Sequence, residues 1–421
     1  MSDDSLMTLV QYQTFQYFWE GAEPTSGMAR ERWHEDHVYP QNDEDVVTTG
    51  GTGFGVMVLL VGIERGFITR EQGFRRLRQI VAFLATADRF HGAWPHWLYG
   101  ETGKVKPFSE KDDGGDLVET AFLVQGLLCV RQYFQEGDEE ERQLAEQIDQ
   151  LWREVEWDWY TRGENVLYWH WSPNYQWAMN FPVGGYNEAL IMYVLAASSP
   201  THAIRPAAYH QGWARRGDIR SENTYYQYDL VLDHYENDYA PVGPLFWAHY
   251  SYLGLNPHNL RDQYGDYWKL NQHHALIHLA YCIDNPEGHI GYGADCWGLT
   301  SSYSVNGYAG HRPGHDLGVI SPTAALSSIP YTPKASLRAM RHFYQDLGPY
   351  LWGPYGFYDA FNEEQGYYPP RYLAIDQGPI PVMIENYRSG LLWNLFMSSP
   401  DVQRGLDTLG FTVGESEEAK Q

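Results

Sequence analysis

The sequence predicts an all-α fold, an (α/α)6 toroid in which an inner ring of helices lies inside an outer ring. Four segments are apolar on every side: 53–66, 115–130, 187–197 and 378–396. They alternate along the chain with the amphipathic segments 70–87, 138–156 and 333–346. A wholly apolar helix must be buried all round, whereas an amphipathic helix can cover it, so the alternation indicates two layers. No alternating apolar and polar run is long enough for a main sheet.

We predict each helix from the spacing of its apolar residues or from a capping residue. Residues 5–20 carry apolar side chains near helical spacing, and Thr69 is expected to cap 70–87. Segment 138–156 is charged but keeps one apolar stripe. About thirteen helices follow in chain order: 5–20, 53–66, 70–87, 115–135, 138–156, 187–198, 202–214, 241–252, 261–283, 320–328, 333–346, 378–397 and 400–409.

The loops between the helices are long and rich in glycine, proline and aromatic residues. Short hairpins are expected at 164–171 and 354–369. The glycine-rich stretch 49–55 has no basic residue for a phosphate, so close helix packing is the better interpretation. Because no Ser/Gly linker divides the chain, we expect one catalytic domain over 1–421, with a charged, disordered tail at 412–421.

The composition favours a neutral sugar as ligand. Aromatic residues make up 16% of the chain, and 54 acidic residues against 29 basic ones give a net charge of −25. Sugar rings stack on aromatic rings, and their hydroxyls bond to carboxylates. The same charge would repel nucleic acids and anionic membranes, so neither is expected as a partner. Aromatics that only fill a core remain the alternative.

The N-terminal residues predict no secretory signal, and no apolar run is long enough to span a membrane. A cytoplasmic location is therefore expected. The three cysteines have no CxxC spacing, which indicates neither a disulfide framework nor a zinc site. His274 and His278 have i, i+4 spacing but lack the adjacent glutamate of a zinc motif. We expect no metal and no cofactor.

Acidic residues at the starts of the apolar helices are the candidate site. Asp116 and Glu119 are i, i+3 neighbours at one helix start, where simple capping is the alternative. Asn187 and Glu188 open a second, almost wholly apolar helix. Asp376 precedes a third.

A charged Glu385 inside the helix that Asp376 precedes needs a partner, such as Arg388.

Aromatic loops supply candidate contacts to a sugar. The loop 355–372 carries Asp359 and Asn362 among tyrosines and phenylalanines. Further candidates for substrate binding come from two other loops, 91–112 and 285–318: Trp94, His96, Trp97, Trp297, Tyr303 and His311. Core packing is the alternative for each single aromatic, but three aromatic clusters in loops favour a groove.

Several blocks of the sequence resemble glycoside hydrolase family 144, the bacterial glucoamylase-like β-1,2-glucanases and sophorose-releasing enzymes. The blocks run in order along the chain: GAWPHW (92–97), DLVETAFLVQGLL (116–128), YNEALIMYVLA (186–196), CWGLT (296–300), YGFYDAFN (355–362) and IDQGPIPVMIENYRSGLLW (375–393). The resemblance implies an (α/α)6 toroid that hydrolyses β-1,2-glucosidic bonds without a metal. It also implies Glu188 and Asp376 as the catalytic carboxylates, with Asp116 and Glu119 lining the cleft.

We expect Glu188 to be the general acid and Asp376 the general base, with inversion at the anomeric carbon. The two roles could be exchanged. A helix N-terminus should lower the pKa of Asp376, whereas Glu188 needs burial to stay protonated.

Other functions stay open. A sugar isomerase or epimerase would use His274 or His311 as its base, and a transglycosylating relative or a non-catalytic sugar-binding protein is also compatible with the sequence. Endo or exo action, chain-length preference and oligomeric state are left open.

Overall fold

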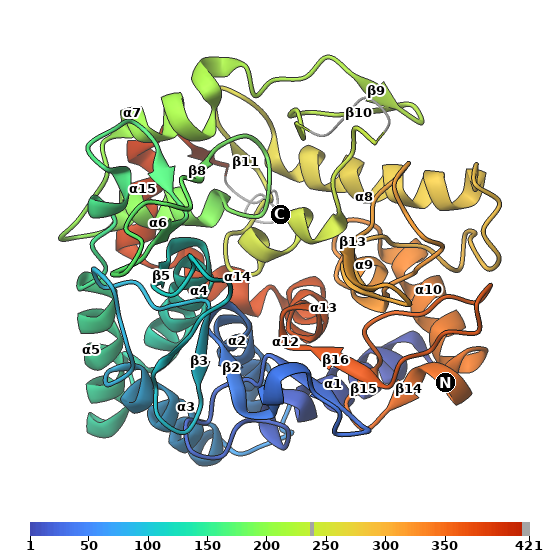
Figure 1. The fold of residues 1–421 in the computed structure, drawn as a ribbon, viewed down its shortest axis with the longest axis horizontal. Coiled ribbons are helices and arrows are strands. Elements are labelled where there is room, and N and C mark those ends of the chain that lie inside the picture. The colour runs from blue at the N-terminus through green and yellow to red at the C-terminus, as the bar shows by residue number, and fades with distance from the viewer. Residues whose placement is uncertain (236–239, 415–421) are drawn as a thin grey trace, which may run out of the picture.

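Two concentric layers of helices form the molecule, which is a computed structural model describing residues 1–235 and 240–414 (Figure 1). The α-helices are α1 (Asp3–Trp19), α2 (Thr49–Glu64), α3 (Arg70–Leu84), α4 (Leu117–Phe134), α5 (Glu139–Arg153), α6 (Leu190–Ser198), α7 (Pro206–Ala208), α8 (Tyr267–Asp284), α9 (Pro322–Leu326), α10 (Pro333–Gln345), α11 (Gly348–Leu351), α12 (Ala374–Gln377), α13 (Pro379–Ser389), α14 (Leu391–Met397) and α15 (Pro400–Thr408).

The inner layer is a closed ring. In order around it, α2 packs on α4, α4 on α6, and α6 on the 3-10 helix η6 (Tyr250–Tyr252), which packs on a second 3-10 helix, η5 (Leu245–Ala248). His249 and Ser328, whose side chains lie 2.9 Å apart, join these 3-10 helices to the turn after α9. Helix α9 then packs on α13, which returns to α2. The predicted (α/α)6 toroid is confirmed.

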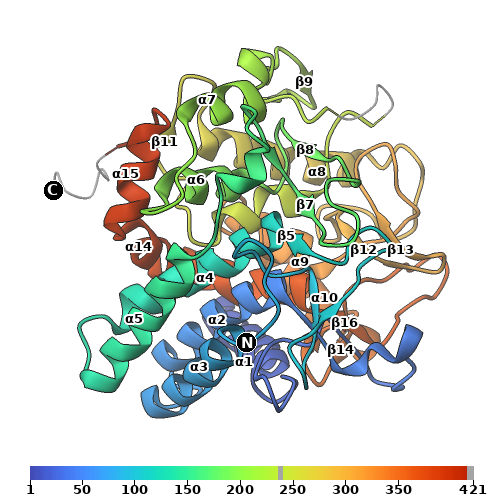
Figure 2. The ribbon, with the colours of Figure 1, turned by 60° about the vertical axis from the view of Figure 1, so that its left-hand side comes forward.

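The outer layer consists of the amphipathic helices. Helices α1, α3, α5 and α10 pack on α13, α2, α4 and α9 respectively. Helices α8 and α15 cover η5 and α6 in the same way, and α3 and α5 lie side by side on the outside (Figure 2). The alternation of apolar and amphipathic segments therefore maps onto inner and outer positions, as hydrophobic burial requires.

Glycines let the first two inner helices approach closely. A Cβ on Gly53 would lie 2.3 Å from the carbonyl oxygen of Phe122, and one on Gly126 would lie 2.0 Å from that of Gly53. Helix packing, rather than phosphate binding, is thus confirmed for the stretch 49–55. Capping fixes the helix starts: Thr48 caps α2, and Thr69 forms a capping box with Gln72 at α3.

Helix α13 is held to its neighbours by a buried charge. Glu385 is bound by Arg65 of α2 at 2.7 and 2.9 Å and accepts a hydrogen bond from Gln11 of α1. The predicted partner was wrong, because Arg388 points instead to Asp4 at the start of α1. Both arginines connect α13 to other helices and so help to close the ring.

The strands are short and form small, separate pairings. They are β1 (Arg32–His34), β2 (Val46–Thr48), β3 (Trp97–Tyr99), β4 (Val105–Lys106), β5 (Gly115–Asp116), β6 (Leu167–Tyr168), β7 (His170–Trp171), β8 (Pro182–Val183), β9 (Thr224–Tyr225), β10 (Tyr228–Asp229), β11 (Leu260–Arg261), β12 (Ser301–Ser304), β13 (Gly307–Gly310), β14 (Trp352–Gly353), β15 (Gly356–Phe357), β16 (Arg371–Leu373) and β17 (Thr412–Val413).

All pairings are antiparallel: β2–β3–β4 form one sheet, and the pairs are β1–β16, β5–β7, β6–β8, β9–β10, β11–β17, β12–β13 and β14–β15. The hairpin predicted at 164–171 is wrong, since β6 and β7 pair with β8 and β5 instead of with each other.

Several predicted helices differ in the structure. Segment 241–252 forms the two 3-10 helices, and 202–214 forms α7 followed by a π-helix, η3 (Tyr209–Trp213). The helix predicted at 378–397 ends at Gly390, whose φ of 71° is left-handed and favours glycine.

At the C-terminus, the predicted disordered tail 412–421 begins instead with β17, and 415–421 lie outside the described residues. The single domain stays a prediction. None of the helices described combines the length and hydrophobicity needed to cross a bilayer.

Candidate active site

A pocket of about 270 Å³ lies where the inner helices α2, α4, α6 and α12 begin. Five predicted site residues line it: His96, Trp97, Glu119, Glu188 and Tyr303. Most of its wall is aromatic, from Trp97, Phe108, Phe122, Trp169, Phe246, Tyr250, Tyr303 and Tyr308. Aromatic faces with a few carboxyls are the surfaces that bind sugar rings.

His96 lies between two carboxyls at the start of α4. Its Nδ1 is 3.0 Å from Asp116 Oδ2, and its Nε2 is 3.8 Å from Glu119 Oε1. Burial opposes charge on the ring, but Glu119 and Asp116 outweigh it and raise the pKa of His96 to about 10. The imidazole is therefore a cation at neutral pH, held in place to donate hydrogen bonds.

The pKa values of the two carboxyls beside His96 are shifted in opposite directions. Asp116 caps α4 by accepting from the N–H of Glu119, and despite its burial the bond to His96 lowers its pKa. Burial raises the pKa of Glu119 to about 8, although the charge on His96 opposes this shift. Glu119 also accepts from the N–H of Gly50 at 2.8 Å, which joins α4 to the start of α2. Capping and the site thus use the same residues.

Glu188 lies two residues before α6, with its side chain toward the pocket. Burial, with a smaller contribution from Asp116, raises the pKa of Glu188 to about 7. Asn187 accepts from the N–H of Ala189 and fixes the turn that leads into the helix. Phe122 and Trp169 supply the apolar wall near Glu188. A glutamate with this pKa can hold a proton at neutral pH, as a general acid must.

Asp376 forms a pair with Asp359 behind the pocket wall. Asp376 is inside α12 and accepts from the hydroxyl of Tyr250 at 3.1 Å, while Asp359 accepts from the N–H of Tyr303 at 2.9 Å. Burial and the neighbouring Asp359 raise the pKa of Asp376 well above its ordinary value. The predicted lowering by a helix N-terminus was wrong, because burial and the second carboxyl outweigh the helix dipole.

Four predicted binding residues lie away from the pocket. Trp94 and Trp297 are fully buried, and their indole N–H groups donate to the carbonyls of Leu84 and Ala335. They are core residues and offer no stacking face, so these two predictions were wrong.

His311 is buried, which lowers its pKa to about 4. Asn362 donates to the carbonyl of Leu317 and holds a turn. Neither side chain reaches the pocket wall.

Other lining residues were missed. Glu31 and Arg32 come from the N-terminal segment, where no local pattern marks them; the β1–β16 pairing places Arg32 opposite Leu373. Phe108 and Tyr308 are 48% and 58% exposed. Trp97 is only 9% exposed, with Phe108 4.8 Å away, so the open aromatic faces belong to Phe108 and Tyr308.

His96, Asp112 and Asp116 together have the ligand atoms for a metal ion. His96 Nδ1 lies 3.0 Å from Asp116 Oδ2, so this ring nitrogen is paired with that carboxyl in the structure.

The sequence is similar to those of known proteins. The family model named Glycoamylase, described as "Putative glucoamylase", matches residues 180–400. An exo β-1,2-glucooligosaccharide sophorohydrolase (non-reducing end) of Parabacteroides distasonis is 46% identical over 97% of this chain. The chain spans 58% of the length of that curated relative.

Solved structures show the same similarity. An endo-β-1,2-glucanase from Chitinophaga pinensis, in complex with sophorotriose and glucose, is 65% identical with a TM-score of 0.96, covering 98% of this chain and 99% of that one. An endo-β-1,2-glucanase from Talaromyces funiculosus with sophorose is 11% identical, with a TM-score of 0.68 over 98% of this chain and 90% of that one, and shares the fold. The matched family model and these close relatives show that this chain belongs to the Glycoamylase family, and that proteins named as β-1,2-glucan hydrolases are among its relatives.

Proposed function

We propose that this protein hydrolyses β-1,2-glucosidic bonds in β-1,2-glucan or in its oligosaccharides. The observation that carries the proposal is an aromatic pocket lined by a protonatable Glu188, with a second carboxyl system, Asp359 and Asp376, behind its wall. Tyr250 connects the two, because it lines the pocket and donates to Asp376. Hydrolysis with inversion needs one protonated carboxyl and one that accepts a proton from water.

In this mechanism Glu188 protonates the departing glycosidic oxygen. The base is Asp376 acting with Asp359: the pair carries one negative charge, and it accepts the proton that water loses as it attacks the anomeric carbon. Burial raises the pKa of Asp359 to about 6, so the pair is ready to accept a proton just below neutral pH. His96, as a cation, is placed to bind sugar hydroxyls or to stabilise the charge on Asp116.

The relatives support the linkage. Their names specify β-1,2-glucans, β-1,2-glucooligosaccharides and sophorotriose, and they include both endo and exo enzymes. The ligand is a neutral oligosaccharide in this proposal, with the open faces of Phe108 and Tyr308 as stacking surfaces. A cytoplasmic location would suit oligosaccharides rather than a long polymer as substrate.

The test is a linkage screen followed by chromatography. Linear oligosaccharides with β-1,2, β-1,3, β-1,4 and α-1,4 bonds are incubated separately with the protein, and with Glu188→Gln as the control. We expect shorter products only from the β-1,2 series. Cleavage of the α-1,4 series alone would contradict the proposal, and products longer than the substrate would indicate transglycosylation instead.

The positions of the two histidines do not support a sugar isomerase. His274 is buried, its Nε2 lies 2.7 Å from the carbonyl oxygen of Gly243, and its pKa falls to about 4 because of burial. His311 is buried likewise. Neither histidine lines the pocket, where an isomerase would need its base.

A further inference from the structure

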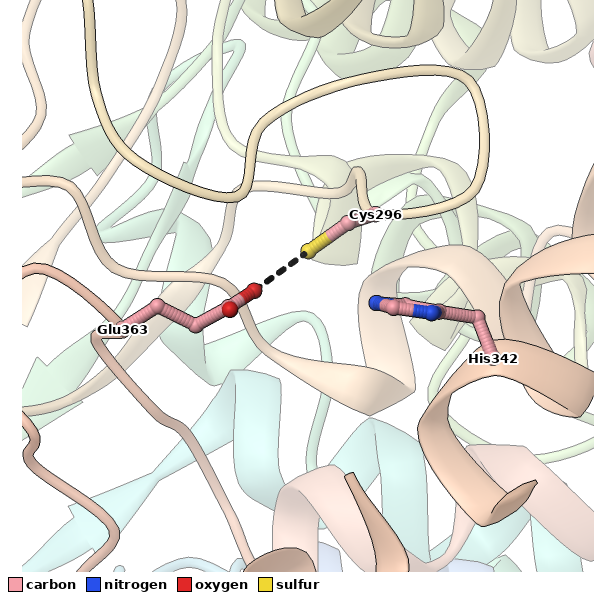
Figure 3. Close-up of side chains that lie close together, drawn as sticks. All are labelled: Cys296, His342 and Glu363. Carbon is pink, nitrogen blue, oxygen red and sulfur yellow. Dashed lines mark hydrogen bonds between the residues drawn. The ribbon is translucent and has the colours of Figure 1, made fainter. Parts of the chain in front are cut away.

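Three side chains of metal-binding type meet outside the pocket. Cys296 lies in the loop after α8, His342 is on α10, and Glu363 is in the turn between β15 and β16 (Figure 3). Their ligand atoms all lie within 4.8 Å of one another. The three residues are far apart in the sequence, so no spacing motif could reveal the group.

Each side chain is held in place by its surroundings. The thiol of Cys296 is 3.9 Å from Glu363 Oε1 (Figure 3). His342 Nδ1 lies 2.8 Å from Asp346 Oδ2, so that bond keeps the proton on Nδ1 and leaves the lone pair on Nε2. A carboxylate on the second ring nitrogen is the usual support of a metal-binding histidine.

A glycine makes room for the carboxylate. Gly291 has a φ of 92°, and a Cβ there would lie 2.2 Å from Glu363 Oε1. Any other residue would push Glu363 away from Cys296. Cys296 is 2% exposed, whereas His342 and Glu363 are half-buried, which leaves a path from solvent to the group.

A nucleophilic role does not suit this cysteine. Burial and then Glu363 raise its pKa well above the ordinary value, so the thiol stays protonated without a cation nearby. Cys296 also does not line the candidate active site. The function that uses all three groups is coordination.

We propose that Cys296, His342 and Glu363 bind a divalent transition metal of the zinc class. One sulfur, one nitrogen and one oxygen ligand suit tetrahedral Zn²⁺, with water as the fourth ligand. Bond lengths of about 2.0–2.3 Å require the side chains to draw together by roughly 1 Å. On binding, the metal replaces the thiol proton of Cys296, which leaves to solvent.

A metal here would join three separate segments near the pocket. Glu363 follows Asp359 by four residues in the same turn region, and Asn362 and Tyr367 close that turn through paired backbone hydrogen bonds. Coordination would tie this turn to α10 and to the loop after α8. We therefore expect Zn²⁺ to raise the melting temperature of the protein.

Cobalt titration of the full chain tests the proposal. Co²⁺ is added to reduced, chelator-treated protein, and the near-ultraviolet thiolate-to-cobalt band is followed. We expect one equivalent to produce the band and Zn²⁺ to displace it. Cys296→Ser should abolish it, and His342→Gln or Glu363→Gln should weaken binding at least tenfold.

Matched controls separate this group from other sites. Cys282→Ser changes another buried thiol, and His202→Gln removes a histidine paired with Asp158 at 3.1 Å; both should keep the band. The other described group of this type, His96, Asp112 and Asp116, has no sulfur and cannot give it.

Absence of the band in the wild type would overturn the proposal, as would its persistence in Cys296→Ser. If Cys296→Ser fails to fold, as judged by circular dichroism, His342→Gln decides: unchanged affinity in that variant refutes the site.

Discussion

The buried carboxyl groups of Asp359 and Asp376 lie close enough for each to shift the pKa of the other. Two buried like charges disfavour each other, so one of the carboxyls must carry a proton. Asp359 Oδ1 and Asp376 Oδ2 have no hydrogen-bond partner among the described residues. The pair therefore shares one proton and holds one negative charge next to the pocket.

Asp376→Asn should lower kcat by about 10²–10⁴-fold, the usual contribution of a general base. The amide can still donate to Asp359, so the fold and KM should change little. Steady-state kinetics on β-1,2-glucooligosaccharides checks this, and near-normal kcat would exclude Asp376 as the base.

Asp359→Asn should act through Asp376 and shift the pH profile. The acidic limb of the wild type follows the Asp359 pKa of about 6, so removing that carboxyl leaves the limb to Asp376 alone and should move it away from 6. A purely structural role would lower activity without moving the limb. The pH profiles of the variant and the wild type distinguish the two.

The wild-type profile of kcat/KM should be bell-shaped, with its acidic limb near 6 and its basic limb near 7. Activity needs the Asp359–Asp376 pair as an anion, which is lost below the Asp359 pKa of about 6. It also needs Glu188 protonated, which is lost above its pKa of about 7. Glu188→Gln should remove the basic limb, and a profile flat across both values would contradict this assignment.

Glu188→Gln should lose about 10²–10⁴-fold in kcat on oligosaccharides. The loss should be much smaller on an aryl β-sophoroside, because a phenolate departs without being protonated. Asp376→Asn, as the control, should gain nothing from the aryl substrate. NMR of the wild-type reaction should show an inverted anomer first, and a retained anomer would refute inversion.

Tyr308→Ala should raise KM, with a loss of about 1–3 kcal/mol in binding if its open face stacks a sugar ring, by analogy with base stacking. Trp297→Phe is the control, because Trp297 is buried away from the pocket. It should alter stability and leave KM unchanged. Since the ligand is uncharged, KM should also depend little on salt.

Glu385→Gln should destabilise the fold by about 2–4 kcal/mol, near the lower end for breaking a buried ion pair, since Arg65 is partly exposed. Burial raises the pKa of Glu385, but bonds from Arg65, Ser389 and Gln11 outweigh it and lower the pKa from 4.5. The stabilisation is present above that ordinary value and is lost as pH falls through the lowered one. Denaturant unfolding at neutral and acidic pH should show the difference shrinking in acid.

The layered fold was predictable because the burial of each helix determines the pattern of apolar residues in its own sequence. Helix α2 is apolar on all sides, and α5 carries one stripe, and these patterns report inner and outer positions directly. The residues that begin inner helices, Asp116, Glu119 and Glu188, follow from the same logic.

Contacts between residues that are distant in the sequence produce no such local pattern. Trp94 and Trp297 look like loop aromatics in the sequence, yet both are buried under neighbouring segments. The pairing of Asp359 with Asp376, which decides the protonation of both, depends on how two loops meet. Glu31 and Arg32 reach the pocket only through the β1–β16 pair.

The β1–β16 pair has a consequence for how the protein folds during its synthesis. Arg32, Trp33 and His34 lie opposite Leu373, Tyr372 and Arg371, so one wall of the pocket joins two segments that are far apart in the sequence. Helix α1 likewise packs on α13, which is synthesised much later. Contacts between segments so far apart in the sequence form slowly. Until β16 and α13 have been synthesised, the nascent chain exposes the surface that they cover. The pocket is thus completed only after β16 has been synthesised, and no fragment ending before β16 can form it.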